Sequence, residues 1–133
     1  KKEFILNFDQ NSNSLNITKS IEIVYGLRNF IGNANKFSKD KVFVNIKSNN
    51  DITEIIIEDD GEGYTNDVLR KIGEPYIKSY KSSIKSKSGL GLGIFIGKTL
   101  LEKNYANILC RNSLTRSGAE VIIKWKNEDL LKI

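Results

Sequence analysis

Apolar side chains recur along this chain with two different periods. Between residues 20 and 37 they recur every three or four positions, at Val24, Leu27, Ile31 and Ala34. Three further apolar residues widen this stripe: Ile23, Phe30 and Phe37. Spacing of this kind gathers apolar residues on one face of an α-helix, which is then buried against the rest of the protein. The pattern predicts a long amphipathic helix over residues 20–37.

Three other segments carry the pattern of β-strands. Residues 41–47 alternate apolar and polar side chains, and residues 52–59 are rich in β-branched ones, with the turn-forming stretch SNND between them. Two such runs joined by a short polar turn predict a β-hairpin. Residues 3–8 have the same strand character, and residues 15–17 are a candidate short partner strand after a polar turn.

The second half of the chain shows helix and hairpin signals in the same order. Thr65 is placed to cap a short helix over residues 66–72, which Gly73 and Pro75 end. Further along, the pattern predicts a second long helix, two closing strands and a terminal helix or tail, at residues 93–104, 106–112, 118–125 and 126–133. The predicted fold class is therefore α+β, a two-layer sandwich in which one mixed, mostly antiparallel sheet is covered on one face by helices.

The composition is that of one globular domain. The 133 residues are 39% apolar and 28% charged, and no apolar run approaches the length of a membrane span, about 20 residues. We therefore expect a single soluble domain over residues 1–133, with no signal peptide. The chain has no histidine, so chemistry that needs an imidazole must borrow one from another domain. Its one cysteine, Cys110, lies in an apolar strand pattern and is expected to be a buried thiol.

Part of the net charge of +5 is concentrated in one segment. Residues 77–88 carry Lys78, Lys81, Lys85 and Lys87 and no acidic residue. A local basic cluster favours an anionic ligand, and a plain solvated loop explains the composition equally well. A nucleic-acid site is less well supported, because the segment has a single aromatic residue and no recognised binding motif.

One face of the first predicted helix carries unusual polar residues. Asn29, Asn33, Lys36 and Phe37 lie at positions i, i+4, i+7 and i+8, so a helix places them in one stripe. Asparagine is a poor helix former, so another role must select it here. Carboxamide oxygens suit a hard cation such as Mg²⁺, an ammonium suits a phosphate, and a ring suits the flat face of a base. A solvated helix face with Phe37 in the core is the alternative.

A DxGxG pattern follows the strand over residues 52–59. Its members are Asp59, Gly61 and Gly63. A carboxylate at this place can accept a hydrogen bond from an exocyclic amine, and glycines let the backbone approach a ligand closely. A plain turn has the same signature, whereas a calcium loop of the EF-hand type would need further acidic residues at fixed spacing.

A second glycine run, Gly89, Gly91 and Gly93, leads directly into the second long helix. Backbone amides at a glycine-rich helix start form a cradle for phosphate. The run is not a P-loop, because no Gly-Lys-Ser/Thr follows, and it is not GxGxxG, because Ile94 occupies the last glycine position. Alone it is weak support for a phosphate site, but its place after the other features strengthens it.

Taken in order, these features resemble the N, G1, F and G2 boxes of the GHKL ATP-binding superfamily, and the resemblance covers nearly the whole chain. The segment NFIGNANKFS is similar to the catalytic ATP-binding domain of bacterial sensor histidine kinases. Four segments are similar to the RegB/PrrB subfamily of redox-responsive sensor kinases: YGLRNFIGNANKFS, KIGEPY, GLGLGIFIGKTLLE and SGAEVIIKW. The resemblance implies the Bergerat fold and binding of Mg-ATP.

The resemblance also implies roles for individual residues of this sequence. Asn33 would coordinate Mg²⁺, and Asn29, one turn earlier, would help to hold the metal and the phosphates. Lys36 would meet phosphate, Phe37 would line the adenine pocket, and Asp59 would bind the adenine amino group. Residues 75–88 would form the ATP lid. The other implied nucleotide contacts are Gly61, Gly63, Tyr76, Lys78, Lys81, Gly89, Leu90, Gly91, Leu92 and Gly93.

The implied activity is that of a protein-histidine kinase. The γ-phosphoryl group would go to a histidine on a separate dimerisation domain of the same homodimeric kinase, for relay to a cognate response regulator. Asn29 stands where the gyrase, Hsp90 and MutL branches have a glutamate that activates water, and an amide cannot take a proton from water, so a kinase is favoured over an ATPase. We expect a cytoplasmic piece of a longer, membrane-anchored kinase, which alone does not autophosphorylate and itself touches neither membrane nor nucleic acid.

Two features depart from the family pattern. Tyr76 is followed by Ile77 and Lys78, where the F box commonly has a phenylalanine and a basic residue, and Cys110 does not match the redox cysteine of RegB-type kinases. We therefore carry no redox role over to Cys110. Two alternatives stay open: a serine kinase of the anti-sigma-factor type, and a non-catalytic nucleotide-binding or docking module.

Overall fold

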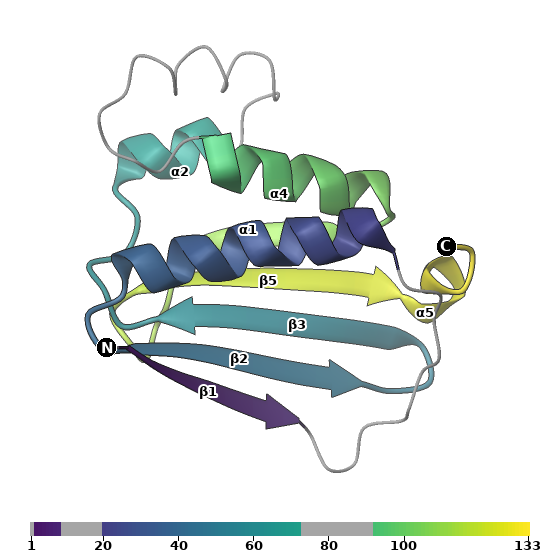
Figure 1. Ribbon diagram of the computed structural model, residues 1–133, viewed down its shortest axis with the longest axis horizontal. Helices are drawn as coiled ribbons and strands as arrows, with labels where there is room; N and C mark the ends of the chain where they lie inside the picture. Colours follow the sequence, from purple (N-terminus) through teal and green to yellow (C-terminus); the bar gives the residue numbers. More distant parts are fainter. Residues whose placement is uncertain (1, 9–19, 73–91) are drawn as a thin grey trace.

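The chain folds around a five-stranded sheet, whose strands lie in the order β1-β2-β3-β5-β4 (Figure 1). This computed structural model describes residues 2–8, 20–72 and 92–133. The strands are β1 (Glu3–Phe8), β2 (Lys41–Ser48), β3 (Ile52–Asp59), β4 (Asn107–Asn112) and β5 (Ala119–Lys126). β1 runs parallel to β2, and the other three pairings are antiparallel. The predicted mixed, mostly antiparallel sheet is confirmed.

The helices are α1 (Ile21–Phe37), α2 (Asn66–Ile72), α4 (Leu92–Lys103) and α5 (Asn127–Leu130). In Figure 1, α1 lies along the sheet. α2 and α4 lie next to α1 on the same side of the sheet, and the short α5 lies near the C-terminus. The strand register pairs Ile57 with Val44 and Val121, and Val121 with Cys110. Ile57 and Val121 are buried, and this row belongs to the core beneath the helices. Coverage of one sheet face by helices is therefore confirmed.

The predicted ends of α1, α2 and α4 agree with the observed ones to within one residue, whereas the expected terminal helix or tail over residues 126–133 is helical only at Asn127–Leu130. Ser20 is the N-cap of α1, because its hydroxyl accepts a hydrogen bond from the Ile23 amide at 3.2 Å. Thr65 accepts one from the Val68 amide at 3.3 Å, which confirms it as the cap of α2. The predicted strand over residues 15–17 and the stop signals at Gly73 and Pro75 lie outside the described residues.

Three residues of the predicted stripe, Ile23, Phe30 and Ala34, are buried in α1, so the predicted face is confirmed in part. Ile23, Gly26, Phe30 and Ala34 are the buried positions of this helix, whereas the Val24, Leu27 and Ile31 of the predicted stripe are only half-buried. The reason is that α1 packs against α4 as well as the sheet. A Cβ added at Gly26 would lie 2.7 Å from the Leu101 Cγ of α4, so the two helices cross closely there.

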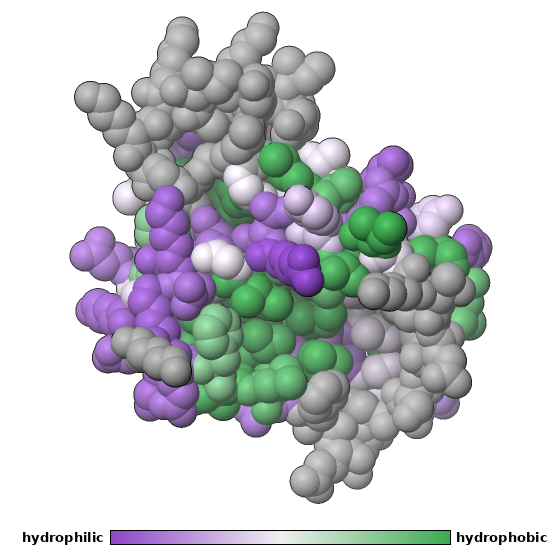
Figure 2. Space-filling view, in the orientation of Figure 1, coloured by the Kyte–Doolittle hydropathy of each residue, from purple (hydrophilic) through white to green (hydrophobic). Residues whose placement is uncertain are grey.

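Apolar side chains also remain exposed at the β1 edge of the sheet. Phe4 and Leu6 are 52% and 56% exposed. Their register partners in β2, Val42 and Val44, belong to the helix-covered face, so both residues lie on that face but beyond the helices. Figure 2 shows apolar residues gathered below α1 on this side of the molecule.

Candidate functional site

A cavity of about 520 Å³ opens where the C-terminal end of α1, the end of β3 and the start of α2 meet. It lies beside residues 61–65, which follow β3 and lie outside the sheet. Its lining consists of Asn33, Lys36, Phe37, Lys39, Asp59, Gly61, Glu62, Gly63, Tyr64, Thr65, Val68 and Ala119. Apolar walls with a few convergent polar groups are typical of a small-molecule site.

Six of the site residues predicted from sequence come together in this lining: Asn33, Lys36, Phe37, Asp59, Gly61 and Gly63. They derive from two segments about 25 residues apart, which the sheet brings side by side. Leu92 is the first residue of α4, and Gly93, which follows it, does not line the cavity. The other predicted nucleotide contacts lie outside the described residues, namely Tyr76, Lys78, Lys81, Gly89, Leu90 and Gly91.

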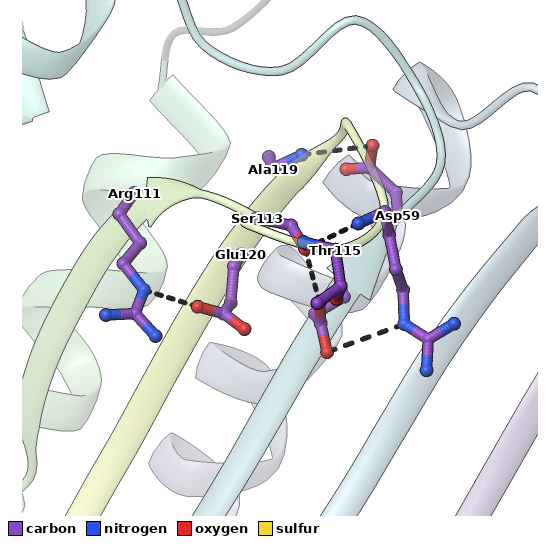
Figure 3. A network of polar contacts seen from close by, with 8 residues as sticks. Asp59, Arg111, Ser113, Thr115, Ala119 and Glu120 are labelled. Carbon is purple, nitrogen blue, oxygen red and sulfur yellow. Dashed lines mark hydrogen bonds and ion pairs between the residues drawn. The ribbon is translucent and has the colours of Figure 1, made fainter.

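Asp59 is the buried acidic residue of the cavity, with only 3% of its surface exposed. Its Oδ1 accepts hydrogen bonds from the backbone amides of Gly61 at 2.8 Å and Ala119 at 3.3 Å, and Figure 3 shows the second of these. Burial raises the pKa of the Asp59 carboxyl above its ordinary value, while the two amides act in the opposite direction. Burial thus disfavours the charged form of the Asp59 carboxyl. Acidic groups with a pKa shifted in this way are common at functional sites.

Gly61 is required where it stands because α1 and the loop after β3 touch there. A Cβ added at Gly61 would lie 2.1 Å from the Phe37 carbonyl oxygen, a separation that real Cβ atoms essentially never show. The same glycine donates its amide to Asp59. One position thus joins Phe37 on one wall of the cavity to the carboxylate on another, and no larger residue fits without a shift of backbone.

Tyr64 forms a buried wall of the cavity and is held by the neighbouring strand. The Asn112 side chain accepts a hydrogen bond from the Tyr64 amide at 2.6 Å and donates one to the Tyr64 carbonyl at 3.0 Å. The Tyr64 hydroxyl lies against the Cys110 thiol. Burial raises the pKa of the Tyr64 hydroxyl well above its ordinary value and raises the pKa of the Cys110 thiol to about 12. Both groups are therefore neutral at physiological pH. Cys110 as a whole residue is half-buried and packs against the core, so the prediction of a buried thiol is confirmed only in part.

The loop between α1 and β2 is fixed by the acid that follows Asp59. Asp60 Oδ1 accepts hydrogen bonds from the amides of Lys39 at 2.8 Å and Asp40 at 3.1 Å. Although burial acts to raise it, these backbone donors bring the pKa of Asp60 below its ordinary value. Asp60 therefore positions Lys39, which lines the cavity, and the two adjacent aspartates have different environments.

Asn29 lies apart from the cavity lining, against the start of α4. Its side-chain amide donates to the Tyr25 carbonyl one turn earlier, at 2.8 Å. A Cβ added at Gly93 would lie 3.5 Å from Asn29 Oδ1, so this oxygen faces the first turn of α4. The predicted stripe is thus divided: Asn33, Lys36 and Phe37 face the cavity, and Asn29 faces the other long helix.

Six lining residues were not predicted as site residues: Lys39, Glu62, Tyr64, Thr65, Val68 and Ala119. Tyr64 directly follows the DxGxG pattern, so its position was a usable signal. Ala119 is different, because only the pairing of β3 with β5 brings it next to Asp59. Nothing in the local sequence around Ala119 points to a site.

The described part of the chain has neither a metal cluster nor a membrane-spanning helix. No group of three or more acidic or cysteine side chains comes together as a metal site within residues 2–8, 20–72 and 92–133. In those same ranges, none of the helices combines the length and apolar character needed to cross a membrane.

Comparison with known sequences identifies a family and individual relatives. The family described as histidine kinase-, DNA gyrase B-, and HSP90-like ATPase matches residues 18–129. The sensor histidine kinase RegB of Cereibacter sphaeroides is 33% identical over 133 aligned residues, which cover 88% of this chain and 29% of RegB. The sensor protein SrrB of Staphylococcus aureus is 29% identical over 100 residues, or 74% of this chain and 17% of SrrB. The chain thus spans less than a third of the length of these curated relatives.

Comparison with solved structures supports the same fold. The mycobacterial sensor histidine kinase MprB superposes with a TM-score of 0.70 at 20% identity, over 93% of this chain and 80% of that one. Full-length ShkA, solved in complex with AMPPNP, gives a TM-score of 0.68 at 22% identity, over 92% of this chain and 25% of that one. At these identities the likeness concerns the fold alone.

Proposed function

Because this chain belongs to the histidine kinase-, DNA gyrase B- and HSP90-like ATPase family, we propose that it is the ATP-binding catalytic domain of a RegB-like sensor histidine kinase. The observation that carries the proposal is the buried Asp59 carboxylate in a cavity whose other walls hold Asn33, Lys36 and Phe37. Its relatives RegB and SrrB are sensor proteins, and its structural neighbour ShkA binds AMPPNP. The buried Asp59 cavity, the likeness to a sensor histidine kinase and the likeness to a protein that binds AMPPNP together support ATP as the ligand.

Asp59 is suited to recognise adenine. Both hydrogen bonds that the described residues make to it reach Oδ1, which leaves Oδ2 to accept from the exocyclic amine. A hydrogen bond to a charged acceptor contributes about 1.5–3 kcal/mol, which corresponds to an affinity change of about 10- to 150-fold. Phe37, Val68 and Ala119 supply apolar surface for the two faces and the edge of the ring.

Asn33 and Lys36 are suited to the phosphates and their metal. Mg²⁺ is usually held by one or two protein oxygens together with substrate phosphates and water. A single carboxamide facing the cavity fits that need better than a cage of acids, and no such cage exists among the described residues. When bound, Mg²⁺ would neutralise charge on the phosphates. Lys36 would do the same from the protein side.

Phosphoryl transfer requires mainly positioning and charge stabilisation from the protein, because the transition state is loose. The nucleophile would be a histidine on a separate dimerisation domain, since this chain has none. Asn29, which cannot act as a base, would hold the start of α4 near the phosphates. The direction of its Oδ1 toward the first turn of α4 supports this role. The phosphate would then pass to a response regulator. We place the domain on the cytoplasmic side of a membrane-anchored kinase.

Calorimetric titration with ADP and with AMPPNP, with and without Mg²⁺, tests the proposal. We expect micromolar or tighter binding that strengthens with Mg²⁺. Asp59→Asn should weaken binding by about 10- to 150-fold, because its amide turns a donor toward the adenine amine. Gly32→Ala is the matched control, since Gly32 lies on the same helix as Asn33 and its added Cβ meets nothing within 4 Å. Equal affinity in the wild type and Asp59→Asn would contradict the adenine assignment.

Transfer of phosphate distinguishes the kinase classes. Fused to the histidine-bearing helices of RegB and supplied with labelled ATP, the domain should form a phosphate bond that is stable in alkali and lost in acid, as expected for phosphohistidine. An acid-stable phosphate on serine would support the serine-kinase alternative instead. Binding of ATP with no transfer in the fusion would support a nucleotide-binding module.

A further inference from the structure

Three polar side chains form a cluster on the sheet face away from the helices. Figure 3 labels one of them, Ser113, near Asp59. Ser113 donates its hydroxyl to Glu58 Oε2 at 2.7 Å, and Arg116 Nε lies 3.7 Å from Glu58 Oε1. The Arg116 guanidinium also stacks 3.7 Å above the centroid of the Phe43 ring. The Glu58 side chain is only 9% exposed, so these two partners offset the cost of burying its carboxylate. We call Glu58, Ser113 and Arg116 the rear cluster.

The rear cluster determines the shape of the loop that joins β4 to β5. Ser113 Oγ accepts hydrogen bonds from the amides of Thr115 at 3.3 Å and Arg116 at 3.1 Å while it donates to Glu58. The Ser113 amide closes the loop by donating to the Gly118 carbonyl at 2.7 Å. One hydroxyl therefore links a buried carboxylate to the backbone of the whole turn.

The far end of this loop touches Asp59 directly. The Ala119 amide is one of the two donors to Asp59 Oδ1. A Cβ added at Gly118 would lie 2.0 Å from the Asp59 carbonyl oxygen and 2.3 Å from its Oδ1, so loop and strand are in close contact there. Glu58 and Asp59 are neighbours in β3 and face opposite sides of the sheet. The same strand thus holds the loop from behind through Glu58 and receives its amide in front through Asp59.

We propose that Glu58, Ser113 and Arg116 are positioning residues for Asp59, and that they set the selectivity of the site for a purine with an exocyclic amine at position 6. The inference rests on the proposed function for its ligand, and on the geometry of the loop for its mechanism. If the loop shifts, the Ala119 amide leaves Oδ1 and the carboxylate is no longer held in one orientation. Affinity for adenine then falls more than affinity for hypoxanthine, which has no amine for Asp59 to accept from.

The test compares ADP with IDP by calorimetry. The wild type should prefer ADP by at least about 10-fold, from the hydrogen bond to a charged acceptor. Arg116→Ala and Ser113→Ala should each reduce the ADP-to-IDP preference by about three- to tenfold, which lies in the lower part of the range of coupling within one polar network. Ser113→Thr, which keeps the hydroxyl, should restore it. A general loss of stability would lower both affinities together and leave their ratio unchanged.

Arg111→Ala is the matched control. Arg111 pairs with Glu120 on the same open face, and this ion pair joins β4 to β5 without reaching the loop. Removing it should leave the ADP-to-IDP ratio as in the wild type. An unchanged ratio in Arg116→Ala and Ser113→Ala, or an equal change in Arg111→Ala, would overturn the proposal.

Hydrogen exchange of the ligand-free protein separates this inference from the proposed function. The Ala119 amide should exchange faster in Arg116→Ala and Ser113→Ala than in the wild type and in Arg111→Ala. If it does not, the rear cluster does not position Asp59, whatever the ligand. If the wild type binds neither nucleotide, the ATP assignment fails, while faster exchange in the variants still supports a positioning role for the cluster.

Discussion

Replacing Gly61 by alanine tests how tightly the two halves of the cavity are joined. The added Cβ would lie 2.1 Å from the Phe37 carbonyl oxygen at the end of α1, 3.0 Å from Asp59 Oδ1 and 3.1 Å from the Phe37 carbonyl carbon. Two of these three atoms belong to backbone, so a side-chain rotation cannot relieve the contact. Because real Cβ contacts below 3.0 Å are essentially never seen, the helix end and the loop must separate by about 1 Å.

The cost of this separation follows from measurements on overpacked cores. Insertion of a methyl group where backbone must move costs about 1–3 kcal/mol, which for a domain of this size lowers the melting temperature by about 3–12 °C. Nucleotide affinity should also fall, because the Gly61 amide is a donor to Asp59 and Phe37 is a wall of the cavity.

Gly32→Ala is the matched control for this substitution, and it should have the opposite sign. Gly32 lies in the middle of α1, is exposed, and its added Cβ would meet nothing within 4 Å. Alanine is favoured over glycine in a helix interior by about 1 kcal/mol, so this variant should be more stable than the wild type. Urea denaturation of the three proteins measures both effects. A Gly61→Ala variant as stable as the wild type, beside a stabilised Gly32→Ala, would refute the close contact between Gly61 and Phe37.

Three further outcomes follow from the charged and buried groups. Asp59→Asn should be at least as stable as the wild type at pH 7 by urea denaturation, because burial raises the pKa of Asp59 and the neutral amide still accepts from Gly61 and Ala119; a clear loss of stability would contradict this. Asp60 has a pKa below its ordinary value, so its stabilising contribution is complete above the pKa of an unfolded aspartate, near 4, and is lost as the pH falls through the lower folded value. Stability of Asp60→Asn should therefore fall less than that of the wild type below about pH 4. Cys110, with a pKa raised to about 12, should react with iodoacetamide at pH 8 far more slowly in the folded protein than in urea; equal rates would show that the thiol is accessible.

The elements of the fold could be predicted from local signals, whereas the order of the strands in the sheet could not. Hydrophobic periodicity and the caps at Ser20 and Thr65 were sufficient to place the described helices and strands within about one residue, except the short terminal helix α5. The insertion of β5 between β3 and β4 has no local signature, because it depends on which edge of the sheet the last hairpin joins. The buried face of α1 was predicted only in part for a related reason: its burial is shared between the sheet and α4, and Gly26 lies at that contact.

The same division holds for the candidate site. Asn33, Lys36, Phe37, Asp59, Gly61 and Gly63 lie in two contiguous motifs, so sequence alone was enough to single them out. Ala119 enters only through strand pairing, and Lys39 enters because its own backbone amide donates to Asp60. Asn29 was predicted on the same stripe as Asn33, Lys36 and Phe37. In the structure the Asn29 end of that stripe faces α4 and not the cavity.

The three consecutive acids Glu58, Asp59 and Asp60 carry the same kind of charge but have different partners, because each lies at a different position on the strand or after it. Alternation along β3 sends Glu58 to the open face and Asp59 to the cavity, and the end of the strand lets Asp60 reach the loop after α1. Glu58 and Asp60 each hold a loop that borders the cavity, and Asp59 between them accepts one amide from each side, from Gly61 and from Ala119. The outer two acids act on loops, and the central one faces the ligand. Replacing each acid by its neutral amide should therefore separate three effects. The expected effects are a changed preference between ADP and IDP at Glu58, lost nucleotide affinity at Asp59, and altered stability in acid at Asp60.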